Sequence, residues 1–193
     1  MRILIVLAAV VLFETSAAGF VRQPAPSLPT VEFTVEVLGS KMAEFDAKME
    51  EYAKLRRSSE KGLPALAVTD NPSEIRRAEQ LLARRIRRAR AGAGRHEIFT
   101  DDTRRAFRQL LRPVTTAATC EFIHDDNPGE FWWAVNREYP KDRPLSSVPP
   151  AMLAVLPQLP EAVFYRFLDT DLFLHDAKAN VMLDRIDNAI RCP

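Results

Sequence analysis

The chain has 193 residues, with 27 Lys and Arg against 26 Asp and Glu and a formal net charge of +1 at pH 7. This length fits one domain that can bury a core of its own. The balanced charge argues against a long charged tail and against a protein devoted entirely to binding polyanions.

Residues 1–18 have the features of a signal peptide. Met1 and Arg2 give a positive start, and the apolar run Ile3–Phe13 is too short to cross a bilayer as a helix. Small residues at 16–18 suit cleavage before Gly19. We therefore expect a periplasmic or secreted protein with no membrane span after leader cleavage. The alternative is that this segment is retained as a membrane anchor.

The first half of the mature chain should be helical. Residues 19–30 are rich in proline and predict an extended linker. A helix is expected over about 34–60, because an apolar seam at alternating spacings of four and three outweighs a short strand-like alternation at its start. The seam comprises Val31, Val35, Leu38, Met42, Phe45, Met49 and Tyr52. Such a seam is usually the core face of a helix, but it could pair with another chain.

Two further helices are expected over about 73–91 and 101–112. The stretch Asp70-Asn71-Pro72-Ser73 caps the earlier helix, and Thr100 starts the later one, with Asp101 and Asp102 in its first turn. The apolar face of the earlier helix comprises Ile75, Ala78, Leu82, Ile86 and Ala89.

The second half predicts a small antiparallel sheet. A strand is expected over about 131–136, and a short helix should follow from Pro149 through Leu156. A three-strand meander is expected over 163–168, 172–176 and 181–186, with a two-residue loop at Asp169-Thr170. The rival interpretation of its last part is a helix from Ala177 to Ile190. The fold class is therefore α+β, a helical N-terminal half packed on a small β-meander in one domain over 31–193.

Cys120 and Cys192 are the only two cysteines. In an exported protein such a pair predicts a disulfide, which would fasten the C-terminus to the middle of the domain. Two free thiols are the alternative. A catalytic cysteine is not indicated, because neither residue lies in a Cys-x-x-Cys motif.

An arginine-rich face on the helix expected over 73–91 is the most distinctive charged feature. Arg84, Arg87 and Arg88 are its candidate anion-binding residues, with phosphate groups as the natural ligand class. The alternative is a structural face paired to acidic side chains, because residues 73–112 are basic whereas residues 121–187 are acidic. Nucleic acid is not an expected partner, since no aromatic residues are interleaved with the arginines.

His175, Asp184 and Arg166 are the candidate catalytic residues. Strict alternation along the three strands would place them on one sheet face, where a histidine oriented by a carboxylate could act as a general base. The sequence places no nucleophile beside them, so a structural polar cluster is the competing interpretation.

No metal or cofactor is expected. His124, Asp125, Asp126 and Glu130 lie in one stretch, but their spacing does not match a calcium loop. Trp132 and Trp133, with Tyr139, could form a platform for a sugar. Alternation places the two tryptophans on opposite faces, so one is expected in the core and the other is a candidate surface aromatic residue. Coverage by a neighbouring helix is the commoner outcome for such a residue.

Four segments resemble a group of uncharacterised exported bacterial proteins, which have no assigned activity. The segments are Arg84–Asp102, Asp125–Glu130, Val135–Pro150 and Tyr165–Ile186. The resemblance covers roughly positions 45 to 190 and implies a bacterial envelope or secreted protein. It carries no functional residues to this chain. Asp169 departs from the glycine expected near that position of the hairpin.

Our leading hypothesis from the sequence is a non-enzymatic envelope protein. It would bind or scaffold an unknown envelope component, or contact an anionic surface, through the arginine-rich helix or the seam of the first helix. The alternative is a hydrolase-like enzyme that uses the face bearing His175 and Asp184.

Overall fold

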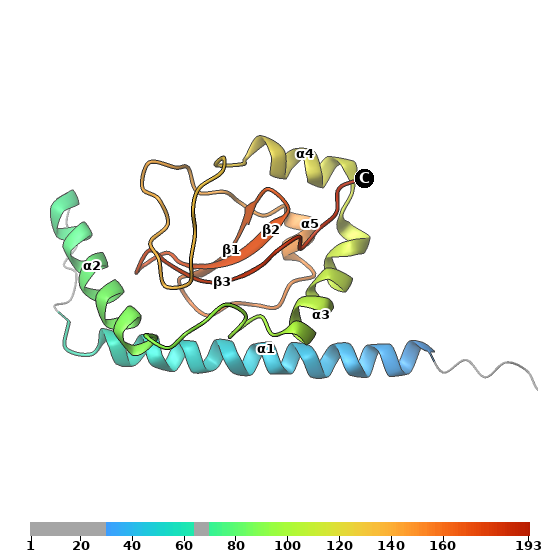
Figure 1. Cartoon of the computed structure of the whole chain (residues 1–193), viewed down its shortest axis with the longest axis horizontal. Helices are drawn as coiled ribbons and strands as arrows, with labels where there is room; N and C mark the ends of the chain where they lie inside the picture. The colour runs from blue at the N-terminus through green and yellow to red at the C-terminus, as the bar shows by residue number, and fades with distance from the viewer. Residues whose placement is uncertain (1–29, 64–69) are drawn as a thin grey trace, which may run out of the picture.

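A computed structural model describes residues 30–63 and 70–193, with side chains from residue 38 onward. The expected leader and most of the expected linker therefore lie outside the described residues. Figure 1 shows the elements in chain order. They are α1 (Thr30–Glu60), α2 (Pro72–Ala89), α3 (Asp101–Leu111), the 3-10 turn η1 (Arg112–Val114), α4 (Ala117–Asp125), α5 (Pro150–Leu153), β1 (Val163–Leu168), β2 (Asp171–Asp176) and β3 (Val181–Ile186).

The meander is confirmed, and with it the α+β fold. The three strands form one antiparallel sheet in the order β1-β2-β3. Phe167 lies opposite Leu172 in the register of β1 and β2, as a two-residue loop at Asp169-Thr170 requires. The rival helix after Ala177 does not form, since the residues from Val181 are extended in β3.

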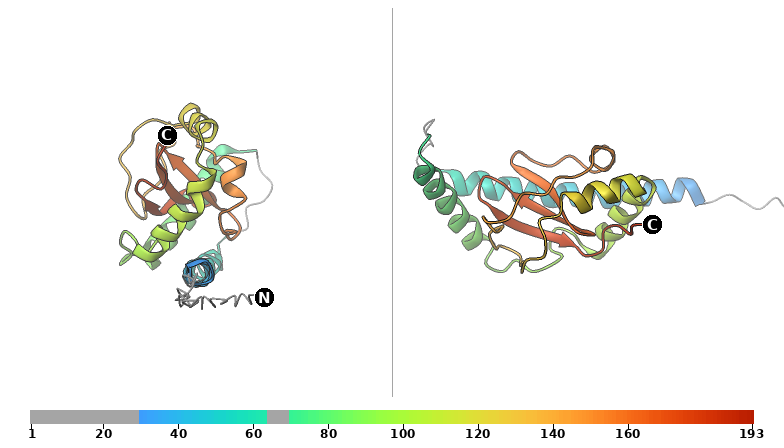
Figure 2. Two further views of the ribbon diagram at one scale, coloured as in Figure 1. Left: turned by 90° about the vertical axis from the view of Figure 1, so that its right-hand side faces the viewer. Right: turned by 90° about the horizontal axis from the view of Figure 1, so that it is seen from above.

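Helices α1 and α3 cover one face of the sheet, and the segment between α4 and α5 passes over the other (Figure 2). Helix α1 runs along the base of the molecule, and its N-terminal part extends past the other elements (Figure 1). The seam of α1 is confirmed where side chains are described, because Phe45, Met49 and Tyr52 are buried in the main core. The side chains of Val31 and Val35 lie outside the described part.

A cluster of aromatic rings joins the helices to the sheet. Phe45 of α1 lies 4.9 Å from Phe107 of α3, measured between ring centroids, and Phe107 lies 6.1 Å from Tyr165 of β1. Ring pairs at these separations add a small attraction to the burial of their large apolar area. The geometry fixes α1 and α3 as one layer beneath the sheet.

Helix α2 belongs to the core only through its C-terminal half. Leu82, Ala83 and Ile86 are buried, whereas Ile75, expected on the same apolar face, is 43% exposed. Figure 1 shows the start of α2 projecting away from the sheet. The arginines of α2 are therefore carried on an element that is fixed at one end and open to solvent at the other.

A β-bulge interrupts the pairing of β2 with β3. Leu174 lies opposite Asp184, but the next residue, His175, lies opposite Met182. The residue left over is Leu183, whose side chain is in the main core. A bulge of one residue reverses the alternation of faces along the rest of the strand. This reversal moves Asp184 to the face that the helices cover.

The prediction of a strand over 131–136 is wrong. The segment is irregular, and it meets β3 through an isolated bridge between Glu138 and Val181. Asn136 has a left-handed backbone with φ 64°, which turns the chain out of an extended path. Its side chain is held by Arg90, since Asn136 Nδ2 donates to the Arg90 carbonyl at 2.6 Å.

The sheet face opposite the helices has a smaller apolar cluster. Tyr139, Leu168, Phe173 and Met182 are buried together, with Phe131 and Trp133 packed against them. Phe131 and Trp133, two of the apolar residues that suggested a strand, instead anchor an irregular segment to the sheet.

The predicted disulfide is confirmed. Cys120 and Cys192 are bonded, and their Cα atoms are 5.8 Å apart. Cys120 lies in α4, a helix that the sequence pattern did not predict, which is capped by Thr116 and Thr119. The helix expected from Pro149 to Leu156 is shorter, Pro150–Leu153.

Candidate functional site

The three candidate catalytic residues do not assemble. His175 and Arg166 lie on the sheet face covered by the irregular segment, opposite Phe164 and Phe173 respectively, whereas the bulge places Asp184 on the face of the helices. The expectation that all three share a face is therefore wrong, because it assumed unbroken alternation along β3.

His175 is a core histidine. It is 2% exposed, its Nε2 lies 2.9 Å from Asn180 Oδ1, and its ring lies 5.4 Å from that of Tyr139. Burial lowers the pKa of His175, and the Asn180 hydrogen bond opposes that shift. Arg166 donates to the Ser146 carbonyl at 2.7 Å. Both side chains are used to hold the segment between α4 and α5 against the sheet.

Asp184 is a structural anchor for the segment between α2 and α3. Its carboxylate accepts the backbone N–H groups of His96, Ile98 and Phe99, each at 2.9 Å. A carboxylate that accepts several backbone N–H groups stabilises an irregular turn at a buried position. The left-handed backbone of His96, with φ 67°, directs these donors toward Asp184.

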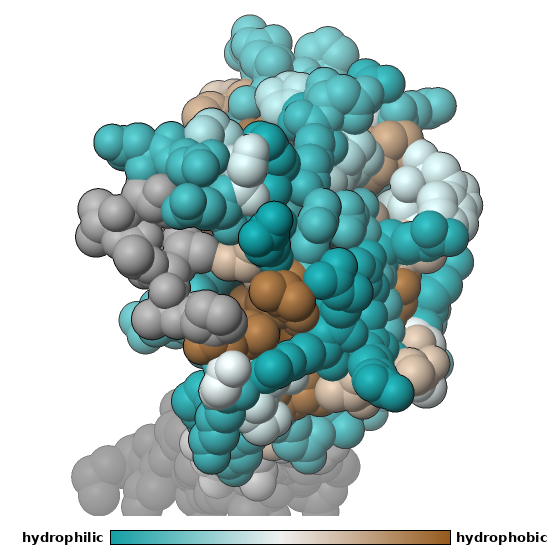
Figure 3. Space-filling model, turned by 90° about the vertical axis from the view of Figure 1, so that its left-hand side faces the viewer, coloured by the Kyte–Doolittle hydropathy of each residue, from teal (hydrophilic) through white to brown (hydrophobic). Residues whose placement is uncertain are grey.

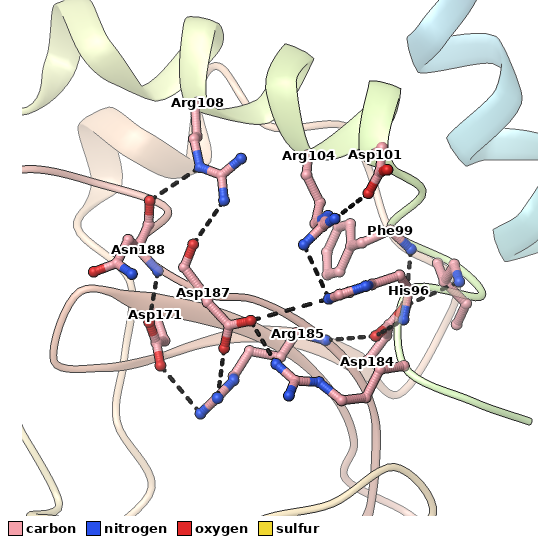
Figure 4. Close-up of polar contacts among 12 residues, drawn as sticks. His96, Phe99, Asp101, Arg104, Arg108, Asp171, Asp184, Arg185, Asp187 and Asn188 are labelled. Carbon is pink, nitrogen blue, oxygen red and sulfur yellow. Dashed lines mark hydrogen bonds and ion pairs between the residues drawn. The ribbon is translucent and has the colours of Figure 1, made fainter.

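A dense ionic network lies beside this anchor (Figure 4). Asp187 is contacted by Arg95 and Arg185, each at 2.5 Å, and its carbonyl accepts from Arg108 at 2.7 Å. His96 Nε2 lies 2.9 Å from Arg104 Nη1 and 4.0 Å from Asp187. Each labelled arginine of the network already has an acidic, carbonyl or imidazole partner, so the network fastens α3 to the end of β3.

The arginines of α2 fall into two classes. Arg85 donates to the carbonyls of Ser59 and Lys61, and Arg87 pairs with Glu138 at 3.3 Å. Arg84 and Arg88 are exposed and have no partner among the described residues.

Arg77 shares the position and the exposure of Arg84 and Arg88. It lies seven residues before Arg84, and Arg88 lies four residues after, so the three form one stripe on α2. Arg77 also has no partner among the described residues. The spacing could have found it from the sequence, whereas the pairing of Arg87 required the fold.

A groove lies at the turn between β1 and β2. It has a volume of about 570 Å³ and is open to solvent. Its walls come from the irregular segment, the hairpin turn and β3, through Glu130, Phe131, Trp132, Leu168, Asp169, Asp171 and Arg185. Trp132 is 71% exposed, so no helix covers it, whereas Trp133 has the guanidinium carbons of Arg95 and Arg185 at 5.3 Å and 3.9 Å from its ring centroid. Tyr139 is buried, so the three aromatic residues do not form one sugar platform.

The described part of the chain contains neither a metal-ligand group nor a membrane-spanning helix. Within residues 30–63 and 70–193, no three His, Cys, Asp or Glu side chains are grouped as metal ligands would be. None of the helices over the same residues combines the length and the apolar character that a membrane crossing needs.

Comparison with protein-family models, with curated proteins and with solved structures finds no match to this chain.

Proposed function

We propose that the chain is an exported bacterial envelope protein that binds the anionic lipid surface of the envelope through the stripe Arg77, Arg84 and Arg88. The observation that carries the proposal is the exposure of these three guanidinium groups on α2, without a partner among the described residues. Their neighbours Arg85, Arg87 and Arg90 are all engaged in contacts within the fold.

The chemistry of the stripe suits phosphate groups. A guanidinium group offers several N–H donors in a fixed plane and stays charged at any physiological pH. Three such groups on one helix face can contact several lipid headgroups at once. Figure 3, a view from the end of the molecule where α2 lies, shows a mostly hydrophilic surface with an apolar patch near its centre. That composition is compatible with a headgroup layer.

Support for export comes from the disulfide and from the character of the N-terminus. A structural disulfide persists in an oxidising compartment and is rare in a reducing cytosol. Residues 1–18 carry the signal-peptide pattern, and four segments resemble exported bacterial proteins. Fractionation with sequencing of the mature N-terminus tests this part: a start at Gly19 in the periplasmic or secreted fraction is expected. A cytosolic chain that still begins at Met1 contradicts it.

The lipid proposal is tested with vesicles of phosphatidylglycerol and phosphatidylcholine. The double variant Arg84→Gln/Arg88→Gln should weaken binding to the anionic vesicles by roughly 30-fold, because each arginine near such a surface contributes about 1 kcal/mol. Binding of the parent chain should also fall as salt is raised.

The matched control is Arg112→Gln/Arg191→Gln. These two arginines are exposed and have no partner among the described residues, so the variant loses the same charge from other places in the fold. Equal losses in both variants would show attraction by net charge alone and contradict a site on α2. Binding to soluble polyphosphate but not to the vesicles would contradict a lipid surface.

A further inference from the structure

His175 has one ring nitrogen without a partner in the part of the chain that the structure describes. The residue is 2% exposed, and its Nδ1 atom is buried with no hydrogen bond. The other nitrogen, Nε2, lies 2.9 Å from Asn180 Oδ1. Asn180 Nδ2 donates to the Tyr139 carbonyl at 3.1 Å, which fixes the orientation of the amide. Asn180 Oδ1 is therefore an acceptor, so Nε2 carries the proton and Nδ1 is a bare lone pair.

A protonated His175 would have no acceptor for its second N–H among the described residues. The charged groups that act on the ring are Arg166 of β1, Asp176 of the same strand and Glu79 of α2. Neither carboxylate is free, because Asp176 is occupied on the face of the helices and Glu79 pairs with Lys141 at 2.8 Å. A buried, charged N–H without an acceptor is strongly unfavourable. The closed structure therefore accommodates His175 only as the neutral ring.

One irregular stretch covers this ring. Residues 136–147, which we call the strap, contain no helix and join the sheet ladder only at the isolated bridge of Glu138. The ring of Tyr139 lies 5.4 Å from that of His175, and Tyr139 is itself 2% exposed. The Asn180 amide contacts the ring of His175 and the carbonyl of Tyr139 together. The protonation state of His175 and the position of the strap are therefore coupled through one side chain.

The strap is the weaker of the two covers of the sheet. At β3 the Asn136 N–H donates to the Met182 carbonyl, and the Met182 N–H donates to the Arg137 carbonyl, both at 2.8 Å. The apolar contacts on this face are those of the smaller cluster, whereas the opposite face contributes to the main core with α1 and α3. A segment with few buried apolar contacts opens at a lower free energy than the core of the same protein.

We propose that protonation of His175 opens the strap from the sheet and exposes the apolar side chains beneath it, while the helices keep the other face covered. Removing Tyr139 from the ring admits water, which supplies the acceptor that the imidazolium lacks. The same movement exposes Phe173 and Met182. The fold thus contains a pH-sensitive device that presents an apolar surface in acid. None of its groups belongs to the arginine stripe.

The test is hydrogen exchange of the intact oxidised protein between about pH 5 and pH 7.5. The amides of Asn136 and Met182 report opening of the strap, and those of Ile98 and Phe99 report the other face. The protection factors of the strap amides should be the smaller. They should fall by up to about tenfold for each pH unit below about 6.5, because the open form takes up a proton that the closed form does not.

His175→Gln should keep the strap amides protected over the whole range, because glutamine can donate to Asn180 and takes up no proton. His124→Gln is the control, because it removes an exposed histidine, and its strap should open in acid as that of the parent does. Asn180→Asp is a second, independent variant. It places a carboxylate beside Nε2 and removes the donor to the Tyr139 carbonyl. Its strap amides should be less protected near neutral pH, and their protection should depend less on pH.

Equal protection at the two sets of amides, falling together in acid, would link His175 to global unfolding alone and would overturn the proposal. Strap amides whose protection does not change below about pH 6.5 would also overturn it. So would a pH dependence that His175→Gln retains or that His124→Gln removes.

Discussion

The Tyr52 hydroxyl donates a hydrogen bond of 2.6 Å to the carboxylate of Asp176, and this contact joins α1 to the end of β2. Asp176 has no exposed surface. Arg56 lies 3.2 Å from the same carboxylate oxygen, and the Ala179 N–H donates to the other at 2.9 Å. A buried carboxylate is tolerated only with such a full set of partners. Burial and the neighbouring Asp176 charge both raise the pKa of Tyr52, so the tyrosine stays a donor.

Tyr52→Phe should lower the free energy of unfolding by about 2 kcal/mol, because it removes a donor from a buried charged group and leaves the packing in place. Urea denaturation measures the change. The matched control is Tyr165→Phe, which removes a hydroxyl that donates to the Pro157 carbonyl at 3.1 Å, an uncharged acceptor. Its expected cost is about 1 kcal/mol. Equal costs would contradict a special role for the Asp176 charge.

Asp184→Asn should destabilise the protein by about 3 kcal/mol, because one amide oxygen replaces two charged oxygens that accept three N–H groups from the segment between α2 and α3. Hydrogen exchange at the amides of Ile98 and Phe99 should become faster than at the amides of the sheet. Asp125→Asn is the control, since Asp125 is exposed and should tolerate the change. A variant with unchanged exchange at Ile98 would show that the carboxylate is not the anchor.

Reduction of the disulfide should lower the free energy of unfolding by about 4 kcal/mol in the chain-entropy model, because the bond closes a loop with a sequence separation of 72 residues. Cys120→Ser/Cys192→Ser should have the same effect, measured by denaturation in the absence of reductant. Cys192 is exposed, so a reductant should reach the bond in the folded protein. A stability that is the same with and without reductant would contradict the prediction.

Stability should fall as the pH drops below about 6.5, through His175. Burial lowers the pKa of His175 in the folded chain below its ordinary value of 6.5. As the pH falls, the unfolded chain therefore takes up a proton on His175 that the folded chain does not. The contribution of His175 to the free energy of unfolding is complete above its ordinary pKa and is lost as the pH falls below it. The slope from one such group approaches 1.4 kcal/mol per pH unit.

His175→Gln should flatten this part of the pH profile, measured as the free energy of unfolding between about pH 5 and pH 7.5. His124→Gln is the control, because it removes an exposed histidine instead of a buried one. If His175→Gln keeps the slope of the parent chain, another group is responsible.

The sequence by itself determined the parts of the fold that depend on local pattern. The seam of α1, the capping residues of α2 and α3, and the turn at Asp169-Thr170 are readable because helix and strand periods repeat over neighbouring residues. Two cysteines and the export pattern likewise predicted the disulfide without a fold. A face of α2 rich in arginine could also be recognised, since spacing alone defines a helical face.

Only the tertiary structure decided which of these side chains are free to act. The bulge at Leu183 separates Asp184 from His175, and a bulge depends on how two strands pair, not on either strand alone. Asn136 turns away from a strand because Arg90, 46 residues earlier, holds its side chain. Arg87 is paired by Glu138 while Arg84 is not, because only the fold brings a distant acid to one position of the stripe. The groove at Trp132 is formed by three segments that are separate in sequence, so no local pattern could reveal it.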